Sequence, residues 1–217
     1  MASSFGKFRV GLAVAAAVLA LSAGVGSAYA EELTADQILN ALKPKGLTRS
    51  LSGGGAAPAE KALSPEDQRF LDGLRAKRTR SLSAGERERV ATLAKEKPSI
   101  DLTITFDYNS ANISRKALPA VTELGKALSS PDLKGNVFMV AGHTDAKGGE
   151  EYNQRLSELR ADAIKRYLSE KFGISAENLV TVGYGKSQLK NASDPLAEEN
   201  RRVQVVNMES SKEARRQ

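Results

Sequence analysis

The stretch GHTDAKGGEEYNQRLSELRADA, residues 142–163, decides how the second half of this chain folds. It follows a short apolar segment, NVFMVAG, which predicts a buried strand, and it continues into a long amphipathic helix. Gly148 and Gly149 allow the chain to turn between the two. We therefore expect Asp145 in a loop at the carboxyl end of a strand and in front of a helix. This is the edge at which α/β sheets commonly bind ligands.

Two polar side chains of the predicted helix face the same way. Asn153 and Arg160 are seven residues apart, which on a helix leaves them within about 20° of each other. Arg160 is long enough to reach back toward Asp145. An aspartate would bind an ammonium group, and an arginine would bind a carboxylate through two parallel hydrogen bonds. The pattern predicts a ligand with an amino-acid-like end, but the alternative remains that Asp145 and Arg160 pair with each other.

Other kinds of site fit the sequence poorly. The chain has one histidine and no cysteine, so it lacks the usual ligand sets for zinc and any disulfide. No G-x-S-x-G context surrounds a serine, and GYGKS lacks the spacing of a phosphate-binding loop. We interpret His143 as a strand-end residue whose ring forms a local hydrogen bond. We expect no catalytic residue, no metal and no cofactor.

Residues 101–208 have the element order of one α+β domain. The segments LTITFDY, NVFMVAG, NLVTVGYG and RRVQVVNM predict four strands. Between them, ISRKALPAVTELGKALSS predicts a helix capped by Ser114 with Pro119 as an internal fault, and residues 150–173 predict the long helix. The order β-α-β-α-β-β predicts a two-layer sandwich of helices on a mixed four-stranded sheet.

The first hundred residues differ in character from this domain. Residues 1–30 combine early basic residues, an apolar run and an A-x-A ending, which indicate a signal peptide cleaved after Ala30; the alternative is an uncleaved inner-membrane anchor. Residues 31–100 predict three capped helices, interrupted by a flexible Gly/Ala/Ser-rich linker at 52–60. We expect residues 209–217 to form a disordered tail.

The charge of the chain is mildly basic. The net charge is +6 over 217 residues, and basic and acidic residues are mixed except in RAKRTR, residues 75–80. This run could contact an anionic polymer or lipid headgroups, and the N-terminal region could bind outer-membrane proteins, but we favour a solvated helix end as the explanation of the run. No aromatic side chains interleave with it, so we expect no binding to nucleic acid.

The motifs GHTDAKGGEEYNQRLSELRADA, VGYG and ENRRVQV, in this order, resemble the OmpA C-terminal-like (OmpA/MotB) family. The resemblance covers residues 102–208 and implies non-covalent binding of peptidoglycan through meso-diaminopimelate in its stem peptide. It implies that Asp145 and Arg160 are the main ligand contacts and that Thr144, Asn153 and Asn109 line the same pocket, with Asp107 a weaker candidate. Arg201 and Arg202 are expected to brace the loops.

The resemblance also implies a place in the cell. We expect a periplasmic protein that associates with peptidoglycan and the outer membrane and that tethers the wall to the envelope. No cysteine follows the apolar run, so the chain departs from the lipoprotein members of the family. The opposing hypothesis is a peptidoglycan hydrolase, which the lack of paired carboxylates or a metal cluster in the sequence disfavours.

Overall fold

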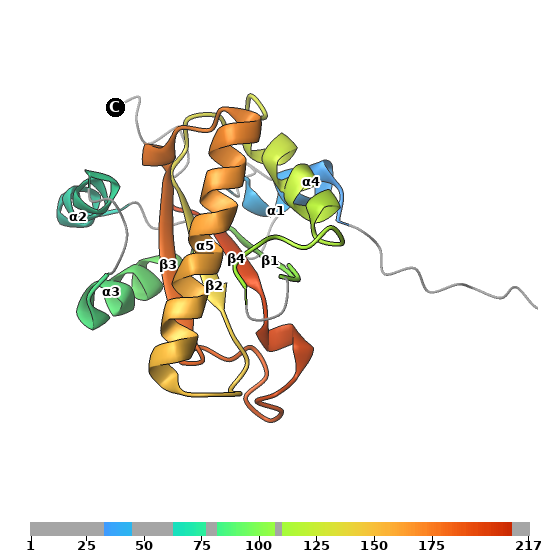
Figure 1. The fold of residues 1–217 in the computed structure, drawn as a ribbon. Helices are drawn as coiled ribbons and strands as arrows, with labels where there is room; N and C mark the ends of the chain where they lie inside the picture. The colour runs from blue at the N-terminus through green and yellow to red at the C-terminus, as the bar shows by residue number, and fades with distance from the viewer. Residues whose placement is uncertain (1–32, 45–62, 77–81, 107–109, 210–217) are drawn as a thin grey trace, which may run out of the picture. The chain divides into compact units, whose positions relative to one another are not determined.

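The computed structural model of the protein describes residues 33–44, 63–76, 82–106 and 110–209 (Figure 1). Three helices come first, and a strand, two longer helices and three more strands follow. The bounds are α1 Ala35–Leu42, α2 Pro65–Ala76, α3 Ala84–Ala94, β1 Ser99–Leu102, α4 Leu118–Leu128, β2 Phe138–His143, α5 Glu150–Phe172, β3 Leu179–Gly185 and β4 Val203–Asn207. Two short 3-10 turns, η1 Ala176–Asn178 and η2 Glu198–Asn200, precede β3 and β4. The predicted signal peptide, linker and RAKRTR run lie wholly or largely outside the described residues.

The four strands form one mixed sheet in the order β1-β4-β2-β3. β2 and β3 are parallel, whereas β4 is antiparallel to both of its neighbours, β1 and β2. This confirms the predicted α+β class. Because β4 lies beside β2 and runs against it, the residues just before β4 come to the same edge as the residues just after β2. That edge carries the stretch HTD.

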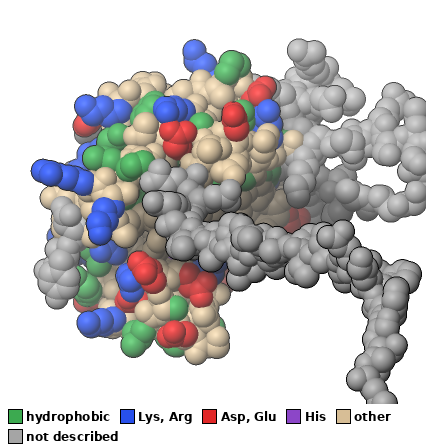
Figure 2. All heavy atoms as spheres, turned by 90° about the vertical axis from the view of Figure 1, so that its right-hand side faces the viewer, with side chains coloured by type: hydrophobic (Ala, Val, Ile, Leu, Met, Phe, Trp, Pro, Cys, Tyr) green, Lys and Arg blue, Asp and Glu red, His purple; other side chains and the backbone are tan. Residues whose placement is uncertain are grey.

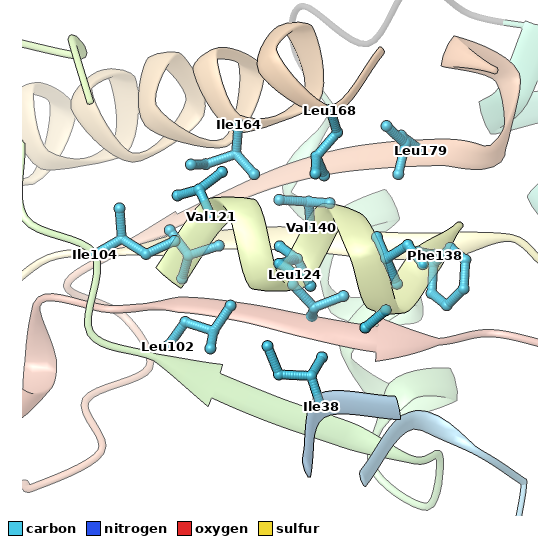
Figure 3. Close-up of a cluster of buried hydrophobic side chains, with 14 of the residues drawn as sticks. Ile38, Leu102, Ile104, Val121, Leu124, Phe138, Val140, Ile164, Leu168 and Leu179 are labelled. Atoms are coloured by element: carbon cyan, nitrogen blue, oxygen red, sulfur yellow. The ribbon is translucent and has the colours of Figure 1, made fainter. Parts of the chain in front are cut away.

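The main core lies between the sheet and the helices α1, α4 and α5 (Figure 3). Alternate strand residues point into it, as expected for a period of two. Phe138 and Val140 of β2 meet Leu124 of α4 and Ile164 of α5 in this cluster, and all four are at most 1% exposed. Burying side chains of this size stabilises the fold by about 1.5–3 kcal/mol each.

The opposite face of the sheet is covered by α2 and α3. Their side chains Leu71, Leu74 and Val90 form a second apolar cluster with Met139 and Val182 of the sheet. Arg89 of α3 links the two helices, since it pairs with Asp67 at 2.9 Å and with Glu66 at 3.1 Å. The helices of the N-terminal region are therefore packed onto the sheet, which places a helical layer on each of its faces.

The first helix, α1, is built into the main core. Its Ile38 and Leu42 are fully buried there. The predicted capping box of Thr34 and Gln37 is present at its start. Glu123 of α4 accepts a hydrogen bond from the backbone N–H of Ala35 at 3.0 Å. Residues 33–44 thus contribute directly to the domain that the sequence places at 101–208.

Two predicted elements shift along the chain. The first strand occupies Ser99–Leu102, earlier than LTITFDY, and Phe106 forms only an isolated bridge with Ile113. The helix predicted from residue 113 begins at Leu118, so Pro119 lies in its first turn instead of interrupting it. Proline is tolerated there because the first N–H groups of a helix have no intrahelical partner.

Glycines let α5 lie directly against β2 and β3. A Cβ atom at Gly142 would lie 2.2 Å from the Ser157 carbonyl oxygen, and one at Gly183 would lie 2.6 Å from Ser157 Oγ. Gly185 has a positive φ of 52°, which favours glycine. The glycines of GHTD and VGYG therefore allow the close contact that fixes the start of α5 beside the sheet edge.

Among the described residues, no helix combines the length and the apolar character that crossing a membrane requires. The face seen in Figure 2 carries basic and acidic side chains interspersed with each other. No field of a single sign dominates this face.

Candidate functional site

The candidate site lies in the loop between β2 and α5, residues 144–149. Backbone hydrogen bonds hold this loop to other parts of the sheet edge. The N–H of Thr144 donates to the Gly185 carbonyl at 2.9 Å, and the N–H of Ala146 donates to the Pro195 carbonyl at 2.9 Å. The loop is therefore tied to the end of β3 and to the segment before η2. Such ties pre-organise a binding site.

Asp145 is held in place by two donors. Its Oδ1 accepts from the backbone N–H of Lys147 at 3.1 Å, and its Oδ2 pairs with Arg201 Nη1 at 3.0 Å. Its side chain is 15% exposed, and that of Arg201 is 42% exposed. An ionised carboxylate has room for about four hydrogen bonds. Asp145 can accept a further donor from a ligand without losing the two that position it.

Arg160 projects from α5 into a partly buried environment. Its guanidinium lies 4.8 Å from the centre of the Phe106 ring, and its Nε donates to the Ser110 carbonyl over 3.4 Å. Burial lowers the pKa of Arg160; Tyr152 and Asp145 act to raise this pKa, and Arg201 acts to lower it. Among the described residues no carboxylate pairs with Arg160.

The alternative that Asp145 and Arg160 simply pair with each other is not what the structure shows. Asp145 is paired with Arg201, and Arg160 is left facing the same region without an anion of its own among the described residues. Asp145 and Arg201 both influence the pKa of Arg160, so the three charges lie within electrostatic range of one another. The described residues thus bring two guanidinium groups and one carboxylate to this region.

Thr144 and Asn153 are both buried, each 2% exposed. Asn153 Nδ2 donates to the Lys147 carbonyl at 2.9 Å, so Asn153 fixes the loop from the helix side. Thr144 Oγ1 has no hydrogen-bond partner among the described residues. The predicted pocket residue Asn109 and the weaker candidate Asp107 lie outside the described residues.

His143 lies on the other side of the sheet from α5. Its ring stacks on Tyr184, with centroids 5.3 Å apart, and Tyr184 belongs to the cluster under α2 and α3. Neither ring nitrogen makes a hydrogen bond of standard geometry in the described part of the chain, although the Gln188 backbone is near enough to act on the pKa of the ring. The expected local hydrogen bond therefore stays a prediction. Burial, aided by the charge of Arg202, lowers the pKa of His143 to about 3. A neutral, buried ring facing away from Asp145 is a packing residue.

The two arginines before β4 have different roles. Arg202 braces the loops as expected, since its Nε donates to Asp101 at 3.3 Å and its guanidinium reaches the Gln188 carbonyl at 3.4 Å. Arg201 also braces a loop, but through Asp145, which makes it part of the site. The sequence analysis expected Arg201 only to brace the loops, and its separation of 56 residues from Asp145 hides this contact from any local pattern. Only the pairing of β2 with β4 places Arg201 next to Asp145.

No cluster of three or more histidine, cysteine, aspartate or glutamate side chains suited to a metal ion occurs within the described ranges. Among the described residues, the loop and the start of α5 carry hydrogen-bond donors and the carboxylate of Asp145, groups of the kind that bind an organic ligand with both charges.

Comparison with known proteins finds similarity over the second half of the chain. Residues 105–202, just under half of the chain, match the OmpA family. The peptidoglycan-associated lipoprotein of Legionella pneumophila is 35% identical over 46% of this chain and 57% of its own length. The peptidoglycan-associated lipoprotein of Pseudomonas aeruginosa is 35% identical over 48% of this chain and 60% of its own length.

A solved structure of a third peptidoglycan-associated lipoprotein is also similar to this chain. The peptidoglycan-associated lipoprotein from Burkholderia pseudomallei is 25% identical over 48% of this chain and 86% of that chain, with a TM-score of 0.40. The chain spans 57% and 60% of the two curated lipoproteins named above, which is less than two thirds of either.

Proposed function

We propose that this protein binds peptidoglycan non-covalently through the side-chain end of meso-diaminopimelate in the stem peptide. That end carries an ammonium group and a carboxylate on one carbon. Asp145 takes the ammonium through its free acceptor positions, and Arg160 takes the carboxylate. Arg201 lies on the other oxygen of Asp145, where it can add a donor to the same carboxylate.

The observation that carries this proposal is that Arg160 has no anionic partner among the described residues. A guanidinium that is partly buried, lies over the Phe106 ring and has no carboxylate partner among the described residues has lost solvation that a bound anion would offset. The ligand carboxylate supplies that anion, and Asp145 beside it selects for a cation on the same ligand. The match of residues 105–202 to the OmpA family and the peptidoglycan-associated relatives support the same ligand.

We infer further that binding occurs without bond cleavage and that the protein acts in the periplasm as a tether between the wall and the outer envelope. Asp145 is the one carboxylate that the described residues place at the site, where it pairs with Arg201, whereas glycoside hydrolysis needs a pair of carboxyl groups with different protonation states. Incubation with purified sacculi should release no soluble fragments.

Sedimentation of the protein with purified diaminopimelate-type sacculi tests the site. Asp145→Ala and Arg160→Ala should each lose binding, because each leaves a ligand charge desolvated and unpaired. That costs about 2–5 kcal/mol, or roughly 30-fold or more in affinity. Arg155→Ala is the matched control, since Arg155 is an exposed arginine on the same helix. Wild-type sedimentation by a folded Asp145→Ala or Arg160→Ala protein would contradict the proposal.

A further inference from the structure

Tyr184, the residue before the last of β3, connects the helices on one face of the sheet to the candidate site. It is 3% exposed and lies in the apolar cluster under α2 and α3. Its hydroxyl donates to the carbonyl of Arg87 in α3 over 3.3 Å. Its ring packs against the ring of His143, the residue before Thr144. One side chain therefore contacts both α3 and the strand end from which the site loop begins.

The end of β3 also holds the loop of the candidate site, residues 144–149. The N–H of Thr144 donates to the carbonyl of Gly185, the last residue of β3, at 2.9 Å. Lys186 follows this strand, and its Nζ donates to the Gly148 carbonyl at 3.1 Å. The two bonds attach both ends of the loop to the end of β3. The position of this strand end therefore helps to set the position of the loop.

The helix α3 supplies the polar partner of the Tyr184 hydroxyl. A buried hydroxyl costs free energy unless it forms a hydrogen bond. Besides the Arg87 carbonyl, the acceptor that the described residues offer is Met139 Sδ at 3.8 Å, and a thioether is a weak acceptor. Val90 of α3 is fully buried in the same cluster as Tyr184 and seats the helix on the sheet. Tyr184 thus loses its main polar partner whenever α3 leaves the sheet.

We propose that α3 positions the binding site and that Tyr184 is the positioning residue through which it acts. The helix holds Tyr184, Tyr184 holds the end of β3, and this strand end holds the loop that carries Asp145. A loop that is already held in its binding arrangement binds a ligand without first paying for a rearrangement. The inference rests on the proposed function for the identity of the ligand, whereas the link from α3 to the loop consists of contacts within the chain.

The variant Tyr184→Phe in the full-length mature protein tests this inference, because it keeps the ring against His143 and removes the hydroxyl. Amide hydrogen exchange followed by NMR reports how often the Thr144 N–H leaves the Gly185 carbonyl. Sedimentation with diaminopimelate-type sacculi reports binding. Loss of the hydrogen bond should speed the exchange of Thr144 and weaken sacculus binding, each by roughly two- to tenfold. Val90→Ala, which loosens α3 and leaves Tyr184 in place, should change both in the same direction.

Leu128→Ala at the end of α4 is the control for stability, because Leu128 is buried in the main core. It should lower the urea midpoint at least as much as Tyr184→Phe, yet leave Thr144 exchange and sacculus binding unchanged. Wild-type exchange or wild-type binding in Tyr184→Phe or Val90→Ala would overturn the inference, and so would equally fast exchange in Leu128→Ala. If the wild-type protein does not bind sacculi, the proposed function fails, whereas the exchange rates still decide whether α3 positions the loop.

Discussion

Asp145 and Arg201 form an ion pair, with 3.0 Å between Oδ2 and Nη1, that joins the loop after β2 to the residues before β4. The two residues are 56 positions apart in the sequence, and the antiparallel pairing of β2 with β4 brings them together. The pair orients the carboxylate that we assign to the ligand ammonium. It also supplies a second guanidinium beside Arg160.

The first prediction concerns Arg201→Ala. Sacculus binding should weaken by roughly 3- to 30-fold, because Asp145 loses its orienting partner and the ligand carboxylate loses a neighbouring donor. Unfolding in urea should show a loss of stability below about 1 kcal/mol, since Arg201 is 42% exposed and exposed pairs contribute little. Unchanged sacculus binding would mean that Arg201 only braces the loop.

The second prediction concerns the contact between α5 and the sheet. Gly142→Ala should destabilise the protein by about 1–3 kcal/mol or more, because its Cβ would lie 2.2 Å from the Ser157 backbone oxygen. The start of α5 must then move away from the loop that carries Asp145. Denaturant unfolding measures the loss, and sedimentation with sacculi measures its effect on binding.

The control for this change is Gly73→Ala in α2. A Cβ there meets nothing within 4 Å, and alanine in an exposed helix interior stabilises by about 0.4–1 kcal/mol. The account fails at this point if Gly142→Ala is as stable as wild type.

The third prediction concerns acid. The pKa of His143 is lowered from its ordinary 6.5 to about 3 by burial, so the unfolded chain takes up a proton more readily than the folded protein. The stability that neutral His143 contributes is fully present above pH 6.5 and is lost as the pH falls toward 3. The slope is about 1.4 kcal/mol per pH unit for one proton.

The comparison is between wild type and His143→Phe, which keeps a ring against Tyr184. Urea unfolding at several pH values from 7 to 4.5 gives the free energy of unfolding of each protein. The difference in this free energy between wild type and His143→Phe should change with pH by this slope. Carboxylates such as Glu123 titrate in both proteins and cancel in the difference. Parallel stability curves would show that His143 is not buried in its neutral form.

The fourth prediction concerns α1. Ile38→Ala should cost about 2–5 kcal/mol of unfolding free energy, because Ile38 is fully buried in the main core. Asn40→Ala, at an exposed position of the same helix, should change stability by less than about 0.5 kcal/mol. A fragment restricted to residues 101–208 should likewise be less stable than the mature chain. Equal stability of Ile38→Ala and wild type would contradict the packing of α1.

The sequence predicted the order of the strands and helices better than the contacts between segments that are far apart in the chain. The order of strands and helices, the capping box of Thr34 and Gln37 and the place of Asp145 in the loop after β2 depend on local patterns, and the structure confirms them. The position of α1 depends on contacts such as that of Ala35 with Glu123, 88 residues apart, which no local pattern reports. The period of the long helix places Tyr152 and Leu159 on its apolar side, yet the structure leaves them 50% and 46% exposed, because a local pattern cannot show where the neighbouring elements end.

The same limit applies to the candidate site. Asp145, Asn153 and Arg160 lie on one loop and one helix, so their spacing was sufficient to group them. Arg201 joins them only through the strand order β4-β2, and Phe106 joins through its contact with Arg160 across the fold. Neither could be assigned without the topology.

The most direct test of the central claim compares sedimentation with diaminopimelate-type and lysine-type sacculi under identical conditions. Lysine keeps the ammonium but lacks the carboxylate, so Arg160 would be buried against the ligand without an anion. We expect a loss on the order of 2–3 kcal/mol, or roughly 30- to 150-fold in affinity, on lysine-type sacculi. Equal retention on both kinds of sacculi would show that Asp145 and Arg160 do not recognise the diamino acid and would contradict the account.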